Sequence, residues 1–252
     1  MKDLCQIPKK STVFVLQGEG IECEKEVHRY FKILGYKTTT VWIFDLLESA
    51  NYIKHFKAGD LLVLPGGFSY SDHFGSGSLL AYKLAKFNFI EKFTSLGVSI
   101  FGICNGFQVL VKLKVFGENV QLIANKNSES MPGFINKWVN FSVNENSYKF
   151  PVRHGEGNLK INGQLNSSVE QLLCYNDDQF NNGSDHQIAG LYTKINNSYI
   201  WGMMPHPEIA LRKMNDPNVP SVIYPPRNQN KLIEFNGDGI SFAEYLFKGK
   251  IL

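Results

Sequence analysis

Apolar residues in the first hundred positions form short runs rich in β-branched side chains, and longer stretches with helical spacing separate these runs. The runs predict buried strands, and the spacing between them predicts amphipathic helices. The predicted strands are TVFVL (12–16), TTTVWIF (38–44), LLVL (61–64) and VSIFGI (98–103), and the predicted helices cover about 22–34, 78–96 and 105–113. This alternation is typical of a parallel sheet with helices packed on its faces.

The pattern changes after Val120, where short runs alternate with Asn/Gly turns and predict antiparallel strands. These strands are VQLIA (120–124), WVNFSV (138–143), KFPVR (149–153), QLLCY (171–175) and IAGLYTKI (188–195). YIWGMMP (199–205) predicts a further strand that ends at His206, and FAEYLF (242–247) predicts a terminal helix. Residues 214–239 carry four prolines and many asparagines, which indicates an ordered surface loop or an interface. We therefore predict one α/β domain over 1–252, with a mostly parallel core, helices on both faces and added antiparallel strands in the C-terminal half.

Composition narrows the class of protein. Apolar residues make up 43% of the 252 residues, charged residues 19%, and the net charge is +3, which indicates a soluble globular protein. Basic residues come at most in pairs such as Lys9-Lys10, so nucleic-acid binding is disfavoured. No apolar run has the length of a signal peptide or a membrane span, and we expect a cytoplasmic protein.

The spacing of the four cysteines bears on metal binding and on disulfide formation. They are Cys5, Cys23, Cys104 and Cys174. Their scatter, without C-x-x-C or a close pairing of Cys with His, argues against a metal site and against a disulfide framework. A reducing compartment is the simpler interpretation.

Cys104 is the strongest candidate for chemistry. It stands in Gly102-Ile103-Cys104-Asn105-Gly106, between a predicted buried strand and a predicted helix. This is the context of a nucleophile elbow, in which small residues let the chain turn sharply and expose the central side chain. The positive end of the helix dipole favours a thiolate there. A lone cysteine is more often a buried packing residue, but the two glycines and the strand-to-helix context favour a nucleophile.

A cysteine nucleophile needs a base and a group that orients the base. His206-Pro207-Glu208 follows a predicted strand, and alternate residues of an extended chain point the same way. Taken alone the motif is weak, because histidines in turns are commonly surface residues. Among the six histidines, only His206 combines the end of a strand with a neighbouring carboxylate.

Two more segments are candidates for the same site as Cys104. Pro65-Gly66-Gly67-Phe68 follows the third predicted strand, and a glycine pair lets backbone N–H groups approach a ligand or a transition state. A simple turn at the exit of the strand is an equal alternative. Gln108 stands four residues after Cys104, and its side chain leans back along the helix toward the space above the thiol.

Taken together, PGGFSYSD (65–72), GICNGFQVL (102–110), RHGEGN (153–158) and GMMPHPE (202–208) resemble the class I (triad) glutamine amidotransferases. Within that class the motifs are most similar to those of the glutaminase components of phosphoribosylformylglycinamidine synthase. The resemblance runs from about Thr12 to Leu211 and implies a flavodoxin-like fold.

The resemblance also implies roles for individual residues. The catalytic set would be Cys104, His206 and Glu208; the oxyanion donors would be backbone N–H groups of Gly67 or Phe68 and of Asn105; and the substrate-binding residues would be Gln108 and His154. The reaction implied is hydrolysis of L-glutamine to glutamate and ammonia. Ammonia would pass to a separate synthetase subunit, with a small accessory subunit as a further partner. No cofactor is implied for this chain, since ATP and Mg²⁺ would be used by the synthetase alone.

The sequence departs from the family pattern at three positions. Ser71 replaces a glycine, and Gly75 and Ile209 stand where arginines are common. None of these is a triad position, but they bear on contacts with the synthetase. Two other functions remain open: an amidotransferase that serves another acceptor, and a catalytically silent interaction protein with this fold.

Overall fold

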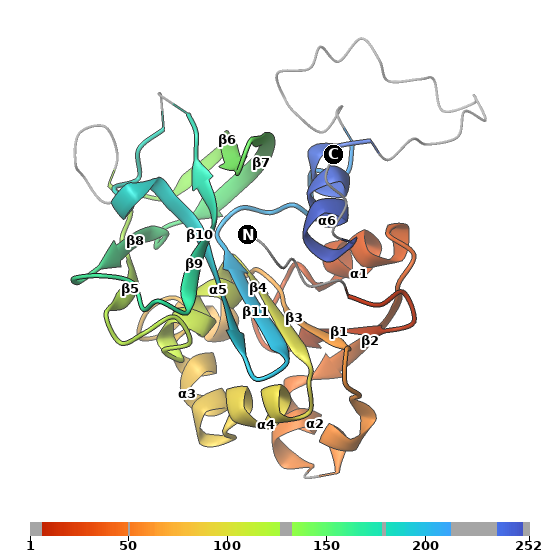
Figure 1. Ribbon diagram of the computed structural model, residues 1–252. Helices are drawn as coiled ribbons and strands as arrows, with labels where there is room; N and C mark the ends of the chain where they lie inside the picture. Colours follow the sequence, from red (N-terminus) through yellow and green to blue (C-terminus); the bar gives the residue numbers. More distant parts are fainter. Residues whose placement is uncertain (1–6, 50, 127–132, 178–179, 213–235, 249–252) are drawn as a thin grey trace.

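A nine-stranded mixed sheet forms the centre of the computed structural model, which describes residues 7–49, 51–126, 133–177, 180–212 and 236–248 (Figure 1). The strand order is β2-β1-β3-β4-β11-β10-β9-β6-β7. The parallel strands are β2 (Lys37–Trp42), β1 (Thr12–Gln17), β3 (Leu61–Leu64), β4 (Ser99–Ile103) and β11 (Ser198–Met203). The antiparallel extension is β10 (Ile188–Ile195), β9 (Val169–Tyr175), β6 (Ile135–Val143) and β7 (Asn146–His154). A separate antiparallel pair is β5 (Val120–Ile123) and β8 (Asn158–Ile161).

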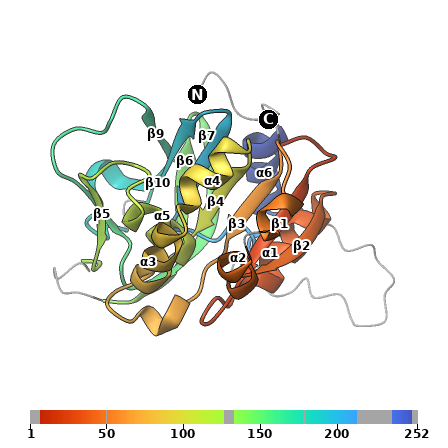
Figure 2. The same ribbon diagram turned by 90° about the horizontal axis from the view of Figure 1, so that it is seen from below.

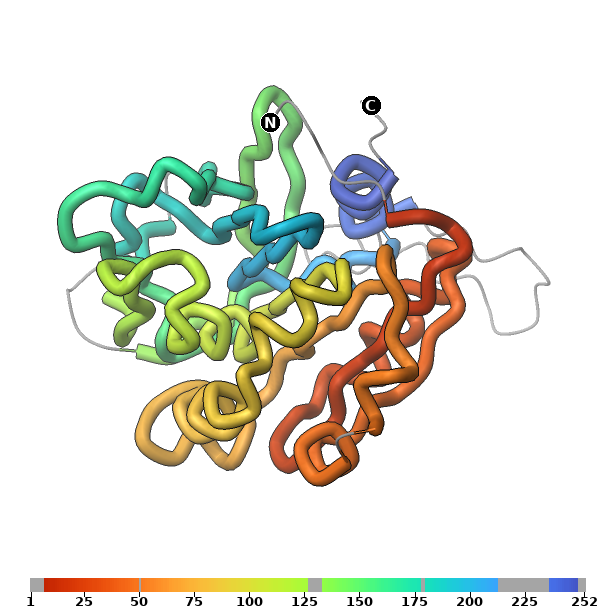
Figure 3. The backbone as a smooth tube through the Cα atoms, turned by 60° about the horizontal axis from the view of Figure 1, so that its bottom comes forward, coloured from red at the N-terminus to blue at the C-terminus, as the bar shows by residue number. Residues whose placement is uncertain are grey.

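Helices cover both faces of the parallel part. They are α1 (Glu24–Ile33), α2 (Ile43–Glu48), α3 (Ser78–Lys86), α4 (Phe89–Ser95), α5 (Asn105–Lys112) and α6 (Asp238–Lys248). The rings of Phe31 in α1 and Phe247 in α6 lie 5.4 Å apart, so these two helices share one face. Figure 3 shows the blue C-terminal helix returning beside the red N-terminal part of the chain, while the green and cyan strands lie on the other side. Figure 2 gives the view from below, with α3 and α5 side by side.

A pair of glycines in neighbouring strands decides where α5 lies. Gly102 in β4 and Gly202 in β11 are register partners, as are the preceding residues Phe101 and Trp201. Because side chains alternate along a strand, the two aromatic rings point to the opposite face, where both contact Phe247 of α6. On the glycine side, a Cβ on Gly202 would lie 2.1 Å from the ring of Phe107, so α5 packs directly on the bare backbone.

The structure confirms the predicted fold class and corrects some element boundaries. The strand predicted over 38–44 ends at Trp42, because Ile43 begins α2. The helix predicted over 78–96 is two helices, because Asn88 adopts a left-handed conformation with φ 53° that no α-helix continues through. Helix α2 and strand β8 were not predicted. Most of the segment 214–239 lies outside the described residues. Among the helices described, none is long and apolar enough to cross a membrane.

One buried hydrogen bond ties α1 to α6, and its removal tests how the two helices are held. The hydroxyl of Tyr30 donates to the carbonyl of Gly239 over 2.8 Å. Tyr30→Phe leaves this buried carbonyl without its partner, so we expect the free energy of unfolding to fall by about 1–2 kcal/mol. Urea denaturation followed by circular dichroism measures the loss. Tyr82→Phe is the control, because Tyr82 is mostly exposed and its variant should be as stable as the parent.

Candidate active site

Cys104 occupies a strained turn between β4 and α5. Its backbone has φ 50° and ψ −105°, outside the regions that non-glycine residues prefer. The two flanking glycines make this turn sterically accessible. A Cβ on Gly102 would lie 2.7 Å from the backbone of Gly106, and a Cβ on Gly106 would lie 2.0 Å from the carbonyl oxygen of Leu64. The G-x-C-x-G pattern is therefore explained by backbone packing, and the predicted elbow is present.

His206 and Glu208 form a buried pair beyond the end of β11. The imidazole Nδ1 lies 2.6 Å from a carboxylate oxygen of Glu208, and the two side chains are 4% and 0% exposed. The predicted proximity is confirmed, but the local chain is a turn rather than a strand, because the amide of Ile209 donates to the carbonyl of His206. Burial lowers the pKa of His206, yet the Glu208 carboxylate and the Cys104 sulfur outweigh it and hold this pKa well above its usual range. The other buried oxygen of Glu208 has no partner among the described residues.

Several chain segments converge on this pair. The sulfur of Cys104, itself a neighbour of the His206 ring, lies 3.6 Å from the carbonyl of Arg153 at the end of β7. The backbone amide of His206 donates to the carbonyl of Pro151 in the same strand. From the opposite side, Gly66 comes so close that a Cβ there would lie 2.7 Å from Cε1 of the imidazole. The structure thus brings Cys104, His206 and Glu208 together as the sequence predicts.

The predicted oxyanion donors differ in their availability. Gly67 has φ 136°, and its N–H donates no backbone hydrogen bond within the described part of the chain. The N–H of Asn105 belongs to the first turn of α5, where amides have no partner within the helix. By contrast, the N–H of Phe68 donates to the carbonyl of Gly20 over 2.7 Å. In this arrangement Phe68 would have to exchange that bond before it could serve an oxyanion.

Gln108 belongs to a closed ring of hydrogen bonds. Its Nε2 donates to the carbonyl of Glu156 over 2.6 Å, and its Oε1 accepts from the side chain of Asn105 over 2.9 Å. Asn105 also donates to Asp72, Asp72 accepts from the hydroxyl of Ser76, and the amide of Ser76 lies 3.3 Å from the Glu156 carboxylate. Both the nitrogen and the oxygen of the Gln108 side-chain amide are thus hydrogen-bonded within the protein. A direct contact with substrate, as predicted, would require one of these bonds to be exchanged.

The same ring anchors a strained loop. Tyr70, Ser71, Asp72 and Phe74 have φ between 51° and 64°, in the left-handed region that favours glycine. Ser71, where the family pattern has glycine, has φ 55°. Such strain persists only where surrounding contacts hold the backbone, and here Asn105 supplies one of these contacts by accepting from the amide of Ser69 over 3.2 Å.

His154 ends strand β7 in a buried position. Its Nδ1 lies 3.1 Å from the side-chain nitrogen of Asn125, which also donates to the His154 carbonyl. An acceptor at Nδ1 places the ring proton on Nε2, and Nε2 is buried without a partner among the described residues. Burial, and then the charge of His206, lower the pKa of His154 to about 3. The sequence prediction of a substrate-binding role for His154 stays a prediction.

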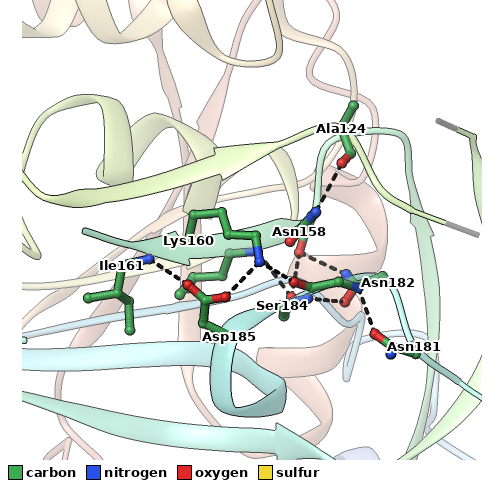
Figure 4. A network of polar contacts seen from close by, with 11 residues as sticks. Ala124, Asn158, Lys160, Ile161, Asn181, Asn182, Ser184 and Asp185 are labelled. Atoms are coloured by element: carbon green, nitrogen blue, oxygen red, sulfur yellow. Dashed lines mark hydrogen bonds and ion pairs between the residues drawn. The ribbon is translucent and has the colours of Figure 1, made fainter. Parts of the chain in front are cut away.

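A polar network holds the turn that follows His154. Asn182 donates to the carbonyl of Gly157, and Lys160 pairs with Asp185 at 2.6 Å (Figure 4). Lys160 also lowers the pKa of the Asp185 carboxyl through a hydrogen bond to it. The loop over 181–185 is thereby fastened to Gly157 and to Lys160 of β8, next to Glu156, whose carbonyl accepts from Gln108.

Cys23 also belongs to the site, although its sequence context did not predict this. Its sulfur, one ring nitrogen of His206 and one carboxylate oxygen of Glu208 all lie within 4.8 Å of one another. Cys23 follows the end of β1, and its place at the same edge of the sheet as Cys104 was the available signal. Gly66 again permits the approach, since a Cβ there would lie 3.3 Å from this sulfur.

Known proteins resemble this chain in sequence and in fold. The profile of the CobB/CobQ-like glutamine amidotransferase domain matches residues 10–237. Phosphoribosylformylglycinamidine synthase subunit PurQ of Methanococcus maripaludis strain C7 is 32% identical over 244 residues, which cover 84% of this chain and 85% of that protein. The Thermotoga maritima subunit PurQ is 32% identical over 218 residues, covering 81% and 91%. The solved structure of PurLQS from Thermotoga maritima matches with a TM-score of 0.64 and 31% identity, covering 82% of this chain and 92% of that one.

The chain therefore belongs to the CobB/CobQ-like family of glutamine amidotransferases. The resemblance inferred from its motifs is confirmed, down to its similarity to the PurQ subunits of phosphoribosylformylglycinamidine synthase.

The buried histidine of β7 makes the stability depend on pH. An unfolded histidine takes up a proton near pH 6.5, whereas His154 in the fold stays neutral down to about pH 3. As the pH falls from 7 to 5, protonation favours the unfolded chain, and this residue alone should remove about 2 kcal/mol of stability. We expect His154→Asn to lose that share of the pH dependence, as measured by urea unfolding at the two pH values.

The matched control for this measurement is His55→Asn, an exposed histidine in a surface turn. It should leave the difference in stability between pH 7 and pH 5 unchanged. An equal pH dependence in the parent and in His154→Asn would contradict the assignment of His154 as a buried neutral group.

Proposed function

We propose that this chain is the glutaminase subunit of a phosphoribosylformylglycinamidine synthase, hydrolysing L-glutamine and supplying ammonia for purine biosynthesis. The observation that carries the proposal is the strained Cys104 elbow beside the buried His206–Glu208 pair. The PurQ names of its relatives support the choice of pathway. The partners proposed are an ATP-using synthetase subunit and a small accessory subunit.

The triad would act in two half-reactions. The thiolate of Cys104 attacks the side-chain carbonyl of glutamine and forms a carbon–sulfur bond. The carbon–nitrogen bond then breaks, and the His206 imidazolium gives its proton to the leaving amine, which departs as ammonia. Water next attacks the γ-glutamyl thioester while His206 accepts its proton, and glutamate leaves as the carbon–sulfur bond breaks and the thiolate–imidazolium pair is restored. Glu208 holds Nδ1 throughout and stabilises the imidazolium.

The surrounding groups would bind the reacting atoms. The N–H groups of Gly67 and Asn105 would stabilise the oxyanion formed at the glutamine carbonyl. His154 holds a buried N–H without a partner among the described residues, and such a donor suits a carboxylate or carbonyl oxygen of the amino-acid part of the substrate. Gln108 would act mainly through Asn105 and Glu156, because both bond its amide.

An exposed aromatic surface supports a partner at the catalytic edge. Its members follow the carboxyl end of β3 or stack beside that segment: Phe68, Phe74 and Phe134. Phe74, 83% exposed, stands in the strained loop that is tied to the first turn of α5. A protein docking on this aromatic surface would cover the site and could move the Gly67-Phe68 peptide. We propose that ATP and Mg²⁺ are bound by that partner.

The triad assignment predicts graded losses of activity. Cys104→Ser and His206→Ala should abolish glutamate release, because they remove the nucleophile and the proton carrier. Glu208→Gln should keep a weak residual rate, lower by about 10⁴-fold as for the orienting group of a hydrolase triad. A glutamine-mimicking electrophile should label Cys104 alone, as read by mass spectrometry of tryptic peptides.

The control for the electrophile is Cys174→Ser, a half-buried cysteine in β9 whose sulfur bonds Gln171. This variant should be labelled like the parent. Near-normal hydrolysis by either His206→Ala or Glu208→Gln in the assembled complex would contradict the triad.

The occupied N–H of Phe68 predicts that the isolated chain is a poor glutaminase. Steady-state glutamate release should rise at least about tenfold, or about 1.4 kcal/mol of barrier, when the cognate synthetase subunit and its substrate are added. Phe74→Asp should weaken this activation and leave the basal rate alone, because it disturbs the aromatic surface. Leu96→Asp is the control, since this exposed residue precedes β4 at the opposite edge of the sheet. Full activity without the synthetase would reject activation by docking.

A further inference from the structure

A second thiol stands beside the catalytic imidazole. The sulfur of Cys23 lies within 4.8 Å of a ring nitrogen of His206 and of a carboxylate oxygen of Glu208, which are within the same distance of each other. It interacts with the His206 ring, as Cys104 does. Three side chains of the described residues therefore interact with the imidazole: the Glu208 carboxylate at Nδ1 and the two thiols of Cys23 and Cys104.

The backbone holds Cys23 in this place. The amides of Glu22 and Cys23 both donate to the carbonyl of Gly66 over 3.2 Å, and Ile21 forms an antiparallel bridge with Gly67. Cys23 is also the N-cap residue of α1, and its carbonyl accepts from the amide of Val27. Its position relative to the oxyanion segment is thus fixed by hydrogen bonds on both sides of the residue.

The two thiols are suited to different tasks. Burial raises the pKa of Cys23, and Glu208 adds to this rise, while the bond to His206 opposes it. Cys23 therefore stays a neutral thiol at physiological pH. Cys23 is also not part of a disulfide.

We propose that Cys23 is a positioning residue for His206: its sulfur fills the side of the imidazole between Gly66 and Glu208, excludes water there and keeps the ring facing Cys104. This inference rests on the proposed function, because it takes His206 as the proton carrier. A sulfur suits the place because it packs as an apolar atom and hydrogen-bonds only weakly. A mobile water molecule in its place would leave the ring free to turn away from the reacting atoms, whereas a group tethered to the chain keeps the ring in position.

The test is steady-state kinetics of Cys23→Ala and Cys23→Ser in the activated complex with the synthetase. Cys23→Ala opens the space to water, and we expect kcat to fall about tenfold, since small displacements of a catalytic group cost up to about 10²-fold in rate. The KM for glutamine should stay within about twofold. Cys23→Ser, which refills the space with a neutral group, should recover most of kcat. The matched control is Cys174→Ala, which should behave as the parent.

A second readout does not depend on turnover. Alkylation of Cys104 by iodoacetamide reports its pairing with His206, and tryptic peptides 11–25 and 93–112 separate Cys23 from Cys104. We expect Cys104 in Cys23→Ala to react more slowly at neutral pH than in the parent, and Cys23 in the parent to react more slowly than Cys104.

The outcomes are distinguishable. Parental kcat and parental Cys104 alkylation in a folded Cys23→Ala protein would overturn the positioning role. A loss of kcat with a matching rise in KM, unrelieved by serine, would also overturn it, since that is the result of a distorted site. If Cys104→Ser keeps its activity, the proposed function itself fails, whatever the result for Cys23.

Discussion

The left-handed backbone of Cys104 is the constraint on which the rest of the site depends. A side chain at φ 50° is held there only because the chain before and after it packs without side chains, at Gly102 and Gly106. Gly106 rests on the carbonyl of Leu64, which locks the elbow to the strand that carries the oxyanion segment. Cys104, the helix behind it and the neighbouring strand are therefore one packed unit, and a change in any of them would move the sulfur.

The antiparallel extension of the sheet contributes to the candidate site. Strand β7 is far from β4 in the strand order, yet its carbonyls at Pro151 and Arg153 meet His206 and Cys104. Strand β7 of the C-terminal half thus lines one side of the site. The segment around Cys23 and Gly66 lines the other side, so that the imidazole is enclosed by parts of the chain that are distant in sequence. Enclosure strengthens the interaction of His206 with Glu208, because water does not screen it.

The ring of hydrogen bonds through Asp72, Asn105, Gln108 and Glu156 links the exposed loop to the elbow. Each of these residues forms at least two hydrogen bonds through polar atoms. A movement of the loop would therefore shift the first turn of α5. The loop itself carries exposed aromatic side chains and several left-handed residues. The surface proposed for the partner is therefore joined by hydrogen bonds to the groups proposed to stabilise the oxyanion.

The sequence by itself determined the parallel core, the elbow at Cys104 and the pairing of His206 with Glu208, because these depend on local patterns. Hydrophobic periodicity marks the strands, two glycines mark the sharp turn, and two residues of separation keep an imidazole and a carboxylate near each other. Only the tertiary structure decided that Cys23 lies beside His206, that the Phe68 amide is occupied, and that Gln108 and Asn105 bond each other and the chain around them. These facts come from contacts between segments separated by tens of residues. Such contacts leave no periodic pattern in a single sequence, because they depend on how the strands are ordered and where the helices pack.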